Sequence, residues 1–235
     1  MESLFSSGVL RFLSVERIAF TVLGYPLSYV ELIGTVFNLW SVWLATKNRV
    51  ATWPVGFVGV LLFLALFYQV RLYSDVVEQI YYLFACAYGW WQWGRASGPN
   101  PKKSLPIRFS TVRTLLIAGL VTIVLSLAAG AFTSRMHLLY PALFPEAASY
   151  PYLDAATTVG SFTATFLMAL RRLECWIYWL VIDTVGVGLY FTKDVRFVAL
   201  LYVIFLVLAA SGLRLWMREA RKEAGRGPVE APAAT

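Results

Sequence analysis

The chain contains an internal repeat whose two copies are displaced by 123 residues. Residues 29–95 align with residues 152–218 without a gap, so that Trp53 matches Trp176. Each copy carries three apolar stretches, and one further apolar stretch lies between the copies. A duplicated unit of this kind restricts the fold to two similar halves. In a membrane protein, such halves are typical of transporters that bind their substrate between them.

The composition indicates a membrane protein. Of the 235 residues, 59% are hydrophobic and only 14% are charged, with a mean hydropathy of +0.66. A soluble domain is about half apolar and about a quarter charged. Apolar runs of about 20 residues recur along the chain, which is the length that crosses a hydrocarbon core. We therefore predict an all-α integral membrane protein, whose net charge of +7 reflects cytoplasmic loops and not nucleic-acid binding.

Seven stretches are predicted to span the membrane in a 3+1+3 arrangement. The loops inside each copy are very short, whereas proline-rich links flank the fourth stretch and mark it as a separate connector. With three helices per unit, a single connecting helix gives both copies the same orientation, so the repeats are predicted to be parallel. The predicted spans are 29–46, 53–70, 75–94, 112–132, 152–170, 175–191 and 196–217.

The repeat also divides the chain into segments. Before the first copy, an interfacial and periplasmic segment is expected to contain an amphipathic helix over residues 4–23, with an extra span as the alternative. The C-terminal tail is expected to be disordered and cytoplasmic. The predicted segments are 1–28 (N-terminal), 29–95 (first repeat), 96–151 (connector), 152–218 (second repeat) and 219–235 (tail).

Basic residues predict the orientation in the membrane. Of the 20 Lys and Arg residues, six fall on the side that holds the N-terminus and fourteen fall on the other side. The more basic side is expected to be cytoplasmic. The prediction is therefore a multi-pass protein of the bacterial inner membrane with a periplasmic N-terminus and a cytoplasmic C-terminus.

The sixth predicted helix carries the clearest candidate site. Trp176, Trp179, Asp183, Gly186 and Tyr190 fall on one helical face. A carboxylate in the middle of a span is costly, so Asp183 is expected to face a cavity or a partner. Aromatic faces beside an anion suit a flat cation. The alternative is that Asp183 pairs with a hydroxyl or amide inside the bundle while the indoles serve as packing.

Other candidate contacts come from the remaining helices. The residue that matches Asp183 in the first copy is Val60, so the copies differ in chemistry, which favours one asymmetric substrate. Glu31 and Asp154 lie at helix starts and are interpreted as structural, because an acid stabilises the positive end of a helix dipole. The remaining candidate binding residues are Gln79, Asn38, Tyr202 and Trp53.

The sequence offers little support for enzyme chemistry. The single histidine, His137, has no H-E-x-x-H partner, and neither a P-loop nor a G-x-S-x-G elbow occurs. Cys86 and Cys175 form no metal-binding spacing or disulfide framework. No metal, cofactor or catalytic residue is therefore predicted. The missing P-loop leaves facilitated diffusion or ion-coupled transport.

Several motifs resemble the PnuC family of bacterial vitamin transporters. The match covers nearly all of the chain outside the tail and the link after the third span, and its motifs recur in both copies. The motifs are GYPLSYVELIGT (24–35), LFYQVRLYSDVVEQIYY (66–82), YGWWQWGR (88–95), LECWIYWLVIDTVGVGLY (173–190) and ALLYVIFLVLAASGLRLWMR (199–218).

The resemblance implies a 3+1+3 fold related to SWEET sugar transporters and a homotrimer. It implies uptake of nicotinamide riboside by facilitated diffusion for NAD biosynthesis, with trapping by a cytosolic riboside kinase. By position it assigns Trp176, Trp179, Asp183 and Gln79 to the substrate site. The family often has asparagine where this chain has Cys86, which removes an amide from the expected cavity.

The residues and the resemblance leave alternatives open. Nicotinamide riboside is a small flat cation with a polyol, which fits aromatic faces, Asp183 and amides such as Asn38 and Gln79. Thiamine is also a flat cation and fits the same residues. Riboflavin is neutral and explains Asp183 less well. A non-transporting membrane scaffold or receptor is a further alternative, although a scaffold would not need a buried carboxylate beside aromatic rings.

Overall fold

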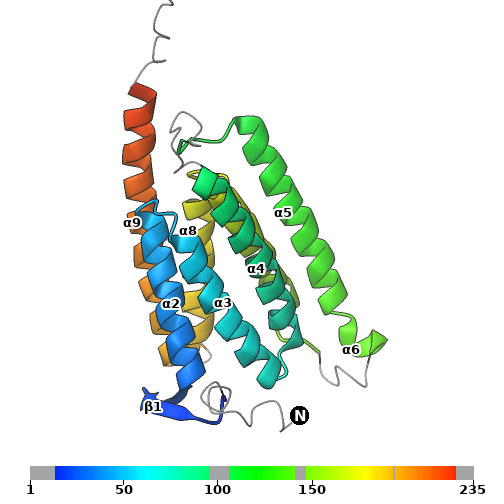
Figure 1. Cartoon of the computed structure of the whole chain (residues 1–235). Coiled ribbons are helices and arrows are strands. Elements are labelled where there is room, and N and C mark those ends of the chain that lie inside the picture. The colour runs from blue at the N-terminus through cyan, green and yellow to red at the C-terminus, as the bar shows by residue number, and fades with distance from the viewer. Residues whose placement is uncertain (1–13, 96–105, 141–146, 193, 226–235) are drawn as a thin grey trace, which may run out of the picture.

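The chain folds into a bundle of long helices. The computed structural model describes residues 14–95, 106–140, 147–192 and 194–225. Figure 1 shows the long helices running side by side between two ends of the molecule. The helices are α2 (Tyr29–Thr46), α3 (Thr52–Gln69), α4 (Tyr73–Gly94), α5 (Val112–Thr133), α6 (Met136–Leu139), α7 (Pro151–Ala169), α8 (Cys175–Thr192) and α9 (Arg196–Gly225).

The helices of the two halves pack in the same order. Within the first half α3 packs against both α2 and α4, and within the second half α8 packs against both α7 and α9. Between the halves, α2 contacts α9 and α4 contacts α7, while α5 lies against α7. The first helix of each half therefore meets the third helix of the other half. The all-helical prediction is confirmed for the long elements, and their bounds lie close to the predicted ones.

The turns that join the helices repeat at the same displacement as the sequence. Asn48 and Arg171 occupy matching positions, and both have positive φ, 51° and 53°. Arg71 and Asp194 are a second matching pair, with φ of 61° and 58°. A left-handed residue after a helix redirects the chain and lets the next amides bond the last free carbonyls. The hydrogen bonds of the first pair of turns match too, with Arg49 N donating to Leu44 O and Arg172 N donating to Leu167 O.

A β-hairpin precedes α2 and differs from the expected amphipathic helix over 4–23. Its strands β1 (Ile18–Val22) and β2 (Tyr25–Ser28) pair antiparallel. Leu23 and Gly24 both have positive φ, 51° and 83°, which is the backbone of a tight type I′ hairpin turn. The helix prediction is wrong for the residues of β1 because it relied on their apolar content and did not take into account the turn that Gly24 permits. Residues 4–13 lie outside the described residues.

The hairpin is tied to both halves of the bundle. Ser28 caps α2 by accepting a hydrogen bond from Glu31 N at 3.3 Å, and the Tyr25 hydroxyl donates to Glu31 Oε1 at 2.8 Å. Burial, followed by this hydrogen bond, raises the pKa of Tyr25 well above its usual range. The Tyr25 ring also stacks on Phe197 of α9, with centroids 5.4 Å apart. The interpretation of Glu31 as a structural residue agrees with these contacts.

The helix α9 continues beyond the predicted end of the second repeat. It runs to Gly225, so the expectation of a disordered tail from residue 219 is wrong for residues 219–225. Alanine, arginine, lysine and glutamate are strong helix formers, and Glu219 pairs with Lys222 at 3.0 Å on one face. The prediction for residues 226–235 lies outside the described residues. The short helix α6 was also not predicted.

Segment 106–110, which leads into α5, is bonded to the loop between α7 and α8. The carboxylate of Glu174 is buried and accepts hydrogen bonds from Ser110 N at 2.7 Å and from Ser110 Oγ at 2.8 Å. Arg108 extends the contact, because its N donates to Arg171 O and its O accepts from Leu173 N, both at 3.2 Å. The connector is therefore attached to the second half at its start as well as along α5.

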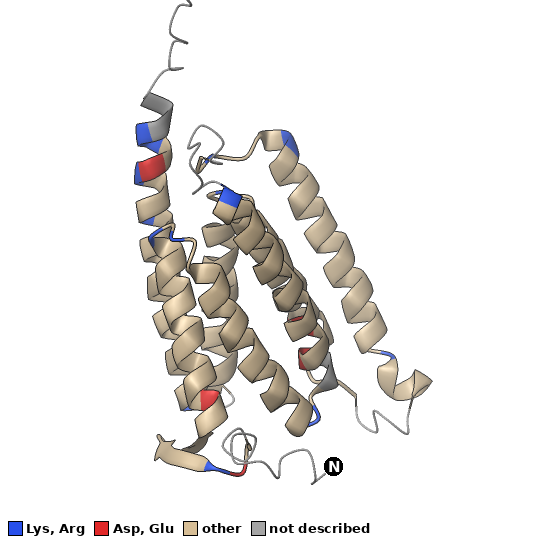
Figure 2. Ribbon diagram, in the orientation of Figure 1, with Lys and Arg blue, Asp and Glu red and all other residues tan. Residues whose placement is uncertain are grey.

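The surface of the bundle suits a membrane. Four helices are long and apolar enough to cross one, over Thr52–Gln69, Val112–Thr133, Cys175–Thr192 and Arg196–Lys222. The second of these, α5, exposes most of its apolar side chains, which only lipid or another apolar surface can cover favourably. Figure 2 shows Lys and Arg gathered at the two ends of the bundle, with long helical stretches between them that carry neither.

Candidate functional site

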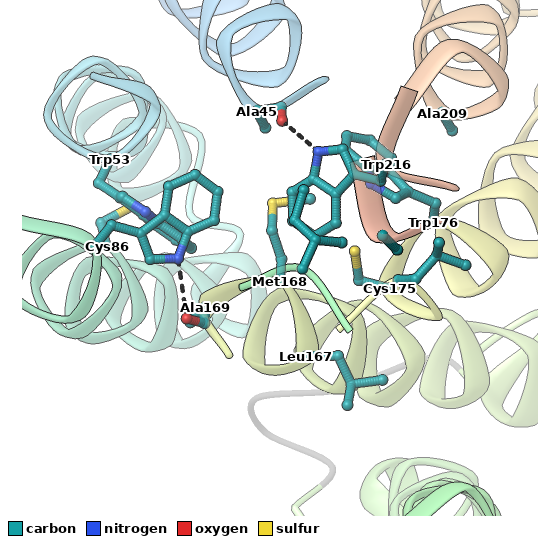
Figure 3. Packing of buried hydrophobic residues seen from close by; sticks show 14 of the residues in the cluster. Ala45, Trp53, Cys86, Leu167, Met168, Ala169, Cys175, Trp176, Ala209 and Trp216 are labelled. Carbon is teal, nitrogen blue, oxygen red and sulfur yellow. Dashed lines mark hydrogen bonds between the residues drawn. The ribbon is translucent and has the colours of Figure 1, made fainter. Parts of the chain in front are cut away.

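Four tryptophans form a cluster where the two halves meet. Trp53 and Trp93 lie edge to face in the first half, with centroids 5.3 Å apart and an interplanar angle of 89°. Trp176 and Trp216 repeat this arrangement in the second half at 5.5 Å and 87°. Trp93 and Trp216 then meet across the interface at 6.0 Å. The set Trp53, Trp93, Trp176 and Trp216 is called the tryptophan cluster below (Figure 3).

The tryptophan cluster holds the halves together by reciprocal hydrogen bonds. Trp93 Nε1, on α4, donates to Ala169 O at the end of α7 at 3.0 Å. Trp216 Nε1, on α9, donates to Ala45 O near the end of α2, also at 3.0 Å. Both bonds are drawn in Figure 3. Each third helix therefore satisfies a terminal carbonyl on the first helix of the opposite half.

Two glycines let the outer indoles pack tightly against the third helices. A Cβ placed on Gly89 would lie 2.4 Å from ring atoms of Trp53, and one placed on Gly212 would lie 2.6 Å from ring atoms of Trp176. Trp53 is 4% exposed and Trp176 is fully buried. The structure thus places two predicted contact residues in the packing of the interface, and their part in substrate binding stays a prediction.

Loss of the interfacial hydrogen bonds should affect the two halves unequally. Ala45 O, the acceptor of Trp216, also accepts a hydrogen bond from Asn48 N at 2.9 Å. For Ala169 O, the acceptor of Trp93, the amide that would bond it in a continuing helix is Leu173 N, which donates to Arg108 O instead. We expect Trp93→Phe to lower the free energy of unfolding by about 2 kcal/mol and Trp216→Phe by about 1 kcal/mol, because an unpaired buried carbonyl costs more than a lost second bond. Thermal unfolding of the detergent-solubilised variants measures both, and a larger loss in Trp216→Phe would contradict this account.

The predicted residues Asp183, Tyr190 and Tyr202 come together between α8 and α9. Asp183 is 5% exposed. The Tyr190 and Tyr202 rings stack with centroids 5.3 Å apart at 18°. Tyr202 fits closely against Gly186, where an added Cβ would lie 2.3 Å from the phenol ring, and it interacts electrostatically with Asp183. Asp183 and the stacked tyrosines therefore lie in one region where α8 packs against α9.

A second acid, Glu78, brings the first half to this cluster. Its Oε1 accepts a hydrogen bond from Thr158 Oγ1 of α7 at 2.5 Å. One turn on, the Tyr82 side chain interacts with Ser161 of α7. Glu78 also interacts electrostatically with Tyr202. Sequence reasoning missed Glu78, although its spacing of four residues from Tyr82 places both on one helical face.

The other predicted residues occupy separate places. Gln79 is buried on α4 beside Glu78. Asn38 packs inside the first half, where its Oδ1 would lie 2.6 Å from a Cβ added to Gly59 of α3. Trp179 is half-buried on α8, and its Nε1 has no hydrogen-bond partner among the described residues. A buried donor without a partner is available to a ligand. Asp154, interpreted as structural, is exposed in the first turn of α7.

Two hollows of the described structure are lined without Asp183. One of about 610 Å³ is at the end of α2, and one of about 530 Å³ is lined by residues of α4, α5 and α7. The candidate binding groups Asp183, Gln79 and Trp176 are instead buried, each at most 9% exposed.

Comparison with known proteins gives one consistent result. A family model described as nicotinamide mononucleotide transporter matches residues 28–218. The nicotinamide riboside transporter PnuC of Escherichia coli strain K12 is 28% identical over 220 residues, which cover 86% of this chain and 91% of the relative. The riboflavin/roseoflavin transporter RibM of Streptomyces davaonensis is 29% identical over 207 residues, with 87% and 92% covered.

A solved structure shares the fold. The crystal structure of the vitamin B3 transporter PnuC matches with a TM-score of 0.65 and 21% identity, and the match covers 93% of this chain and 92% of that one. The resemblance to PnuC proteins that the motifs indicated is therefore confirmed. The relatives are membrane transporters and not enzymes, and the apolar helices fit a multi-pass membrane protein. The chain belongs to the nicotinamide mononucleotide transporter family, the family of the PnuC proteins.

Proposed function

We propose that this protein takes up nicotinamide riboside by facilitated diffusion across the bacterial inner membrane. The observation that carries the proposal is Asp183, a buried carboxylate that interacts electrostatically with Tyr202, whose ring stacks on Tyr190. An anion next to aromatic faces attracts a flat cation such as the pyridinium ring. The names of PnuC relatives along most of the chain support the choice of vitamin. A cytosolic kinase then phosphorylates the riboside, which keeps it inside the cell.

The proposed membrane arrangement is seven spans in a 3+1+3 order. The four clearly apolar helices are joined by α2, α4 and α7, which pack between or beside them. The two halves are parallel, with the N-terminus periplasmic and the C-terminus cytoplasmic, because the more basic end is expected inside. A homotrimer completes the proposal, as the family resemblance implies.

The proposed site lies between the halves. Asp183, Tyr190, Trp179 and Tyr202 contribute from the second half, and Gln79 contributes from the first. The hydrogen bond from Thr158 to Glu78 supports this placement, because it brings α4 of the first half to α7 of the second. Trp176 and Trp53 border the site from the tryptophan cluster, and Asn38 contributes an amide once the helices separate.

Riboflavin is the second candidate, because RibM is about as similar to this chain as PnuC is. Cys86 also stands where PnuC proteins are expected to have an amide, which favours a substrate whose polarity differs from that of nicotinamide riboside. Thiamine, a flat cation, fits the same charged site. These three vitamins differ in charge and size, so a direct comparison separates them.

A binding titration tests the choice of vitamin. We expect calorimetric titration of the detergent-solubilised protein to show saturable binding of nicotinamide riboside and at least about tenfold weaker binding of riboflavin and thiamine. Of the three, only nicotinamide riboside combines a positive charge with a polyol that the amides of the site can bond. Tighter binding of riboflavin would overturn the assignment. Uptake into proteoliposomes without ATP then distinguishes a facilitator from a receptor, since a receptor binds without flux.

A further inference from the structure

The two hollows described above occupy matching positions in the repeat. The hollow at the end of α2 is lined by Trp43, Leu44, Lys47, Arg49 and Ala51. The positions that match the first four, at the displacement of 123 residues, are Phe166, Leu167, Leu170 and Arg172, and all four line the other hollow. The same surface therefore occurs once in each half, at the end of the first helix.

The two surfaces differ in what lines them beyond the repeated residues. In the second half, Thr114, Ile117, Ala118 and Val121 of α5 line one side of the hollow. There, Arg172 Nη1 donates to Phe109 O at 3.5 Å. In the first half, none of the described residues that line the hollow comes from α5. This hollow, defined by Trp43, Leu44, Lys47, Arg49 and Ala51, is called the α2 hollow below.

The charge of the α2 hollow also differs from that of its counterpart. Lys47 stands where the second half has Leu170, so this surface holds two cations instead of one. Both Lys47 and Arg49 are exposed, and neither forms an ion pair with an acid in the part of the chain that the structure describes. Two neighbouring cations without an acidic partner attract an anion.

An apolar stripe runs from the α2 hollow along the helix. Val36, Trp40 and Trp43 are 53%, 49% and 48% exposed. Together with Lys47 they are spaced by four, three and four residues, which places them on one face of α2. Tryptophan prefers the boundary between headgroups and acyl chains. The surface thus continues from paired cations to an interfacial aromatic ring and then to an apolar face.

We propose that the α2 hollow binds an anionic phospholipid. The phosphate lies between Lys47 and Arg49, and an acyl chain follows Trp43, Trp40 and Val36 in the position that α5 occupies in the other half. Paired cations match the headgroup charge, and the apolar stripe matches the chain. A soluble anion would use only the cations and leave the stripe uncovered.

A titration of lipid into the delipidated, detergent-solubilised protein tests this site. We expect phosphatidylglycerol to raise the melting temperature in a saturable manner, and phosphatidylcholine or inorganic phosphate at equal concentration to leave it nearly unchanged. In Lys47→Gln/Arg49→Gln, the half-saturating concentration of phosphatidylglycerol should rise about tenfold or more, because each basic residue near an anionic headgroup contributes measurably to affinity.

Two control variants separate this site from general surface charge. Arg214→Gln/Arg218→Gln removes two exposed cations of α9, and its titration should match that of the unchanged protein. Lys47→Arg/Arg49→Lys keeps the charges and should retain binding. Equal weakening in both glutamine pairs, or an equal response to phosphatidylcholine, would overturn the proposal.

Photo-crosslinking gives a test that needs no substitution. Phosphatidylglycerol with a photoreactive acyl chain should label the peptide that contains Trp40 and Trp43 more strongly than peptides of α5. Predominant labelling of α5 or of another helix would overturn the assignment of this lipid to the α2 hollow.

Discussion

Asp183→Asn is expected to weaken nicotinamide riboside binding about ten- to hundredfold. The substitution keeps the shape of the side chain and removes its charge. Hydrogen bonds to charged groups contribute about 1.5–3 kcal/mol, and about 1.4 kcal/mol corresponds to a tenfold change in affinity. Calorimetric titration of the purified variant measures the loss, and uptake into proteoliposomes should fall in parallel.

Two comparisons make the Asp183 prediction specific. Thr184→Val is a matched control, because Thr184 is exposed and its hydroxyl bonds only Leu180 O of its own helix among the described residues, at 2.7 Å. This variant should bind as the unchanged protein does. Any residual binding of neutral riboflavin should be insensitive to Asp183→Asn. Unchanged nicotinamide riboside affinity in Asp183→Asn would remove Asp183 from the site.

Gly212→Ala is expected to destabilise the protein by about 1–2 kcal/mol. The added Cβ would lie 2.6 Å from ring atoms of the fully buried Trp176, and overpacking in a tight core costs about 1–3 kcal/mol. The clash must exceed the gain in helix propensity of about 1 kcal/mol that alanine brings over glycine. Thermal unfolding in detergent should show a clear fall in melting temperature, and the matching variant Gly89→Ala should behave likewise.

The control for this prediction is a helical glycine with free space around it. Gly188 of α8 has no atom within 4 Å of an added Cβ among the described residues, so Gly188→Ala should leave the melting temperature unchanged or slightly raised. Trp176→Leu will itself destabilise the protein, but Gly212→Ala should cost less in that background than in the unchanged protein, because the smaller side chain makes room for the methyl group. An equal cost of Gly212→Ala in both backgrounds would show that the clash is not with Trp176.

The sequence predicted the long helices well, because apolar runs bounded by short polar loops depend on local composition. The bounds of α2 agree with the expected span of 29–46. The hairpin was missed because apolar residues 18–27 satisfy a helical pattern as readily as a strand, and only the backbone at Leu23 and Gly24 decides between them. The extension of α9 was missed because a charged run has no apolar signal.

The candidate site was predictable only in part. Asp183 could be found because a carboxylate inside a membrane span costs free energy. Tyr190 and Tyr202 could be found because few polar side chains occur inside the predicted spans. Glu78 was overlooked because its partner, Thr158, lies 80 residues away, and nothing local to α4 indicates that pairing. The reciprocal bonds from Trp93 and Trp216 depend on which carbonyl faces each indole, which follows from how the halves dock and not from either copy alone.

The attachment of segment 106–110 to the loop between α7 and α8 has a mechanical consequence. Ser110 holds Glu174 and α5 lies along α7, so the described part of the connector is fastened to the second half at two places. Among the described residues, the matching loop of the first half forms no side-chain hydrogen bond of this kind. Any displacement of α2–α4 relative to the second half would therefore have to break the bonds from Trp93 and Trp216.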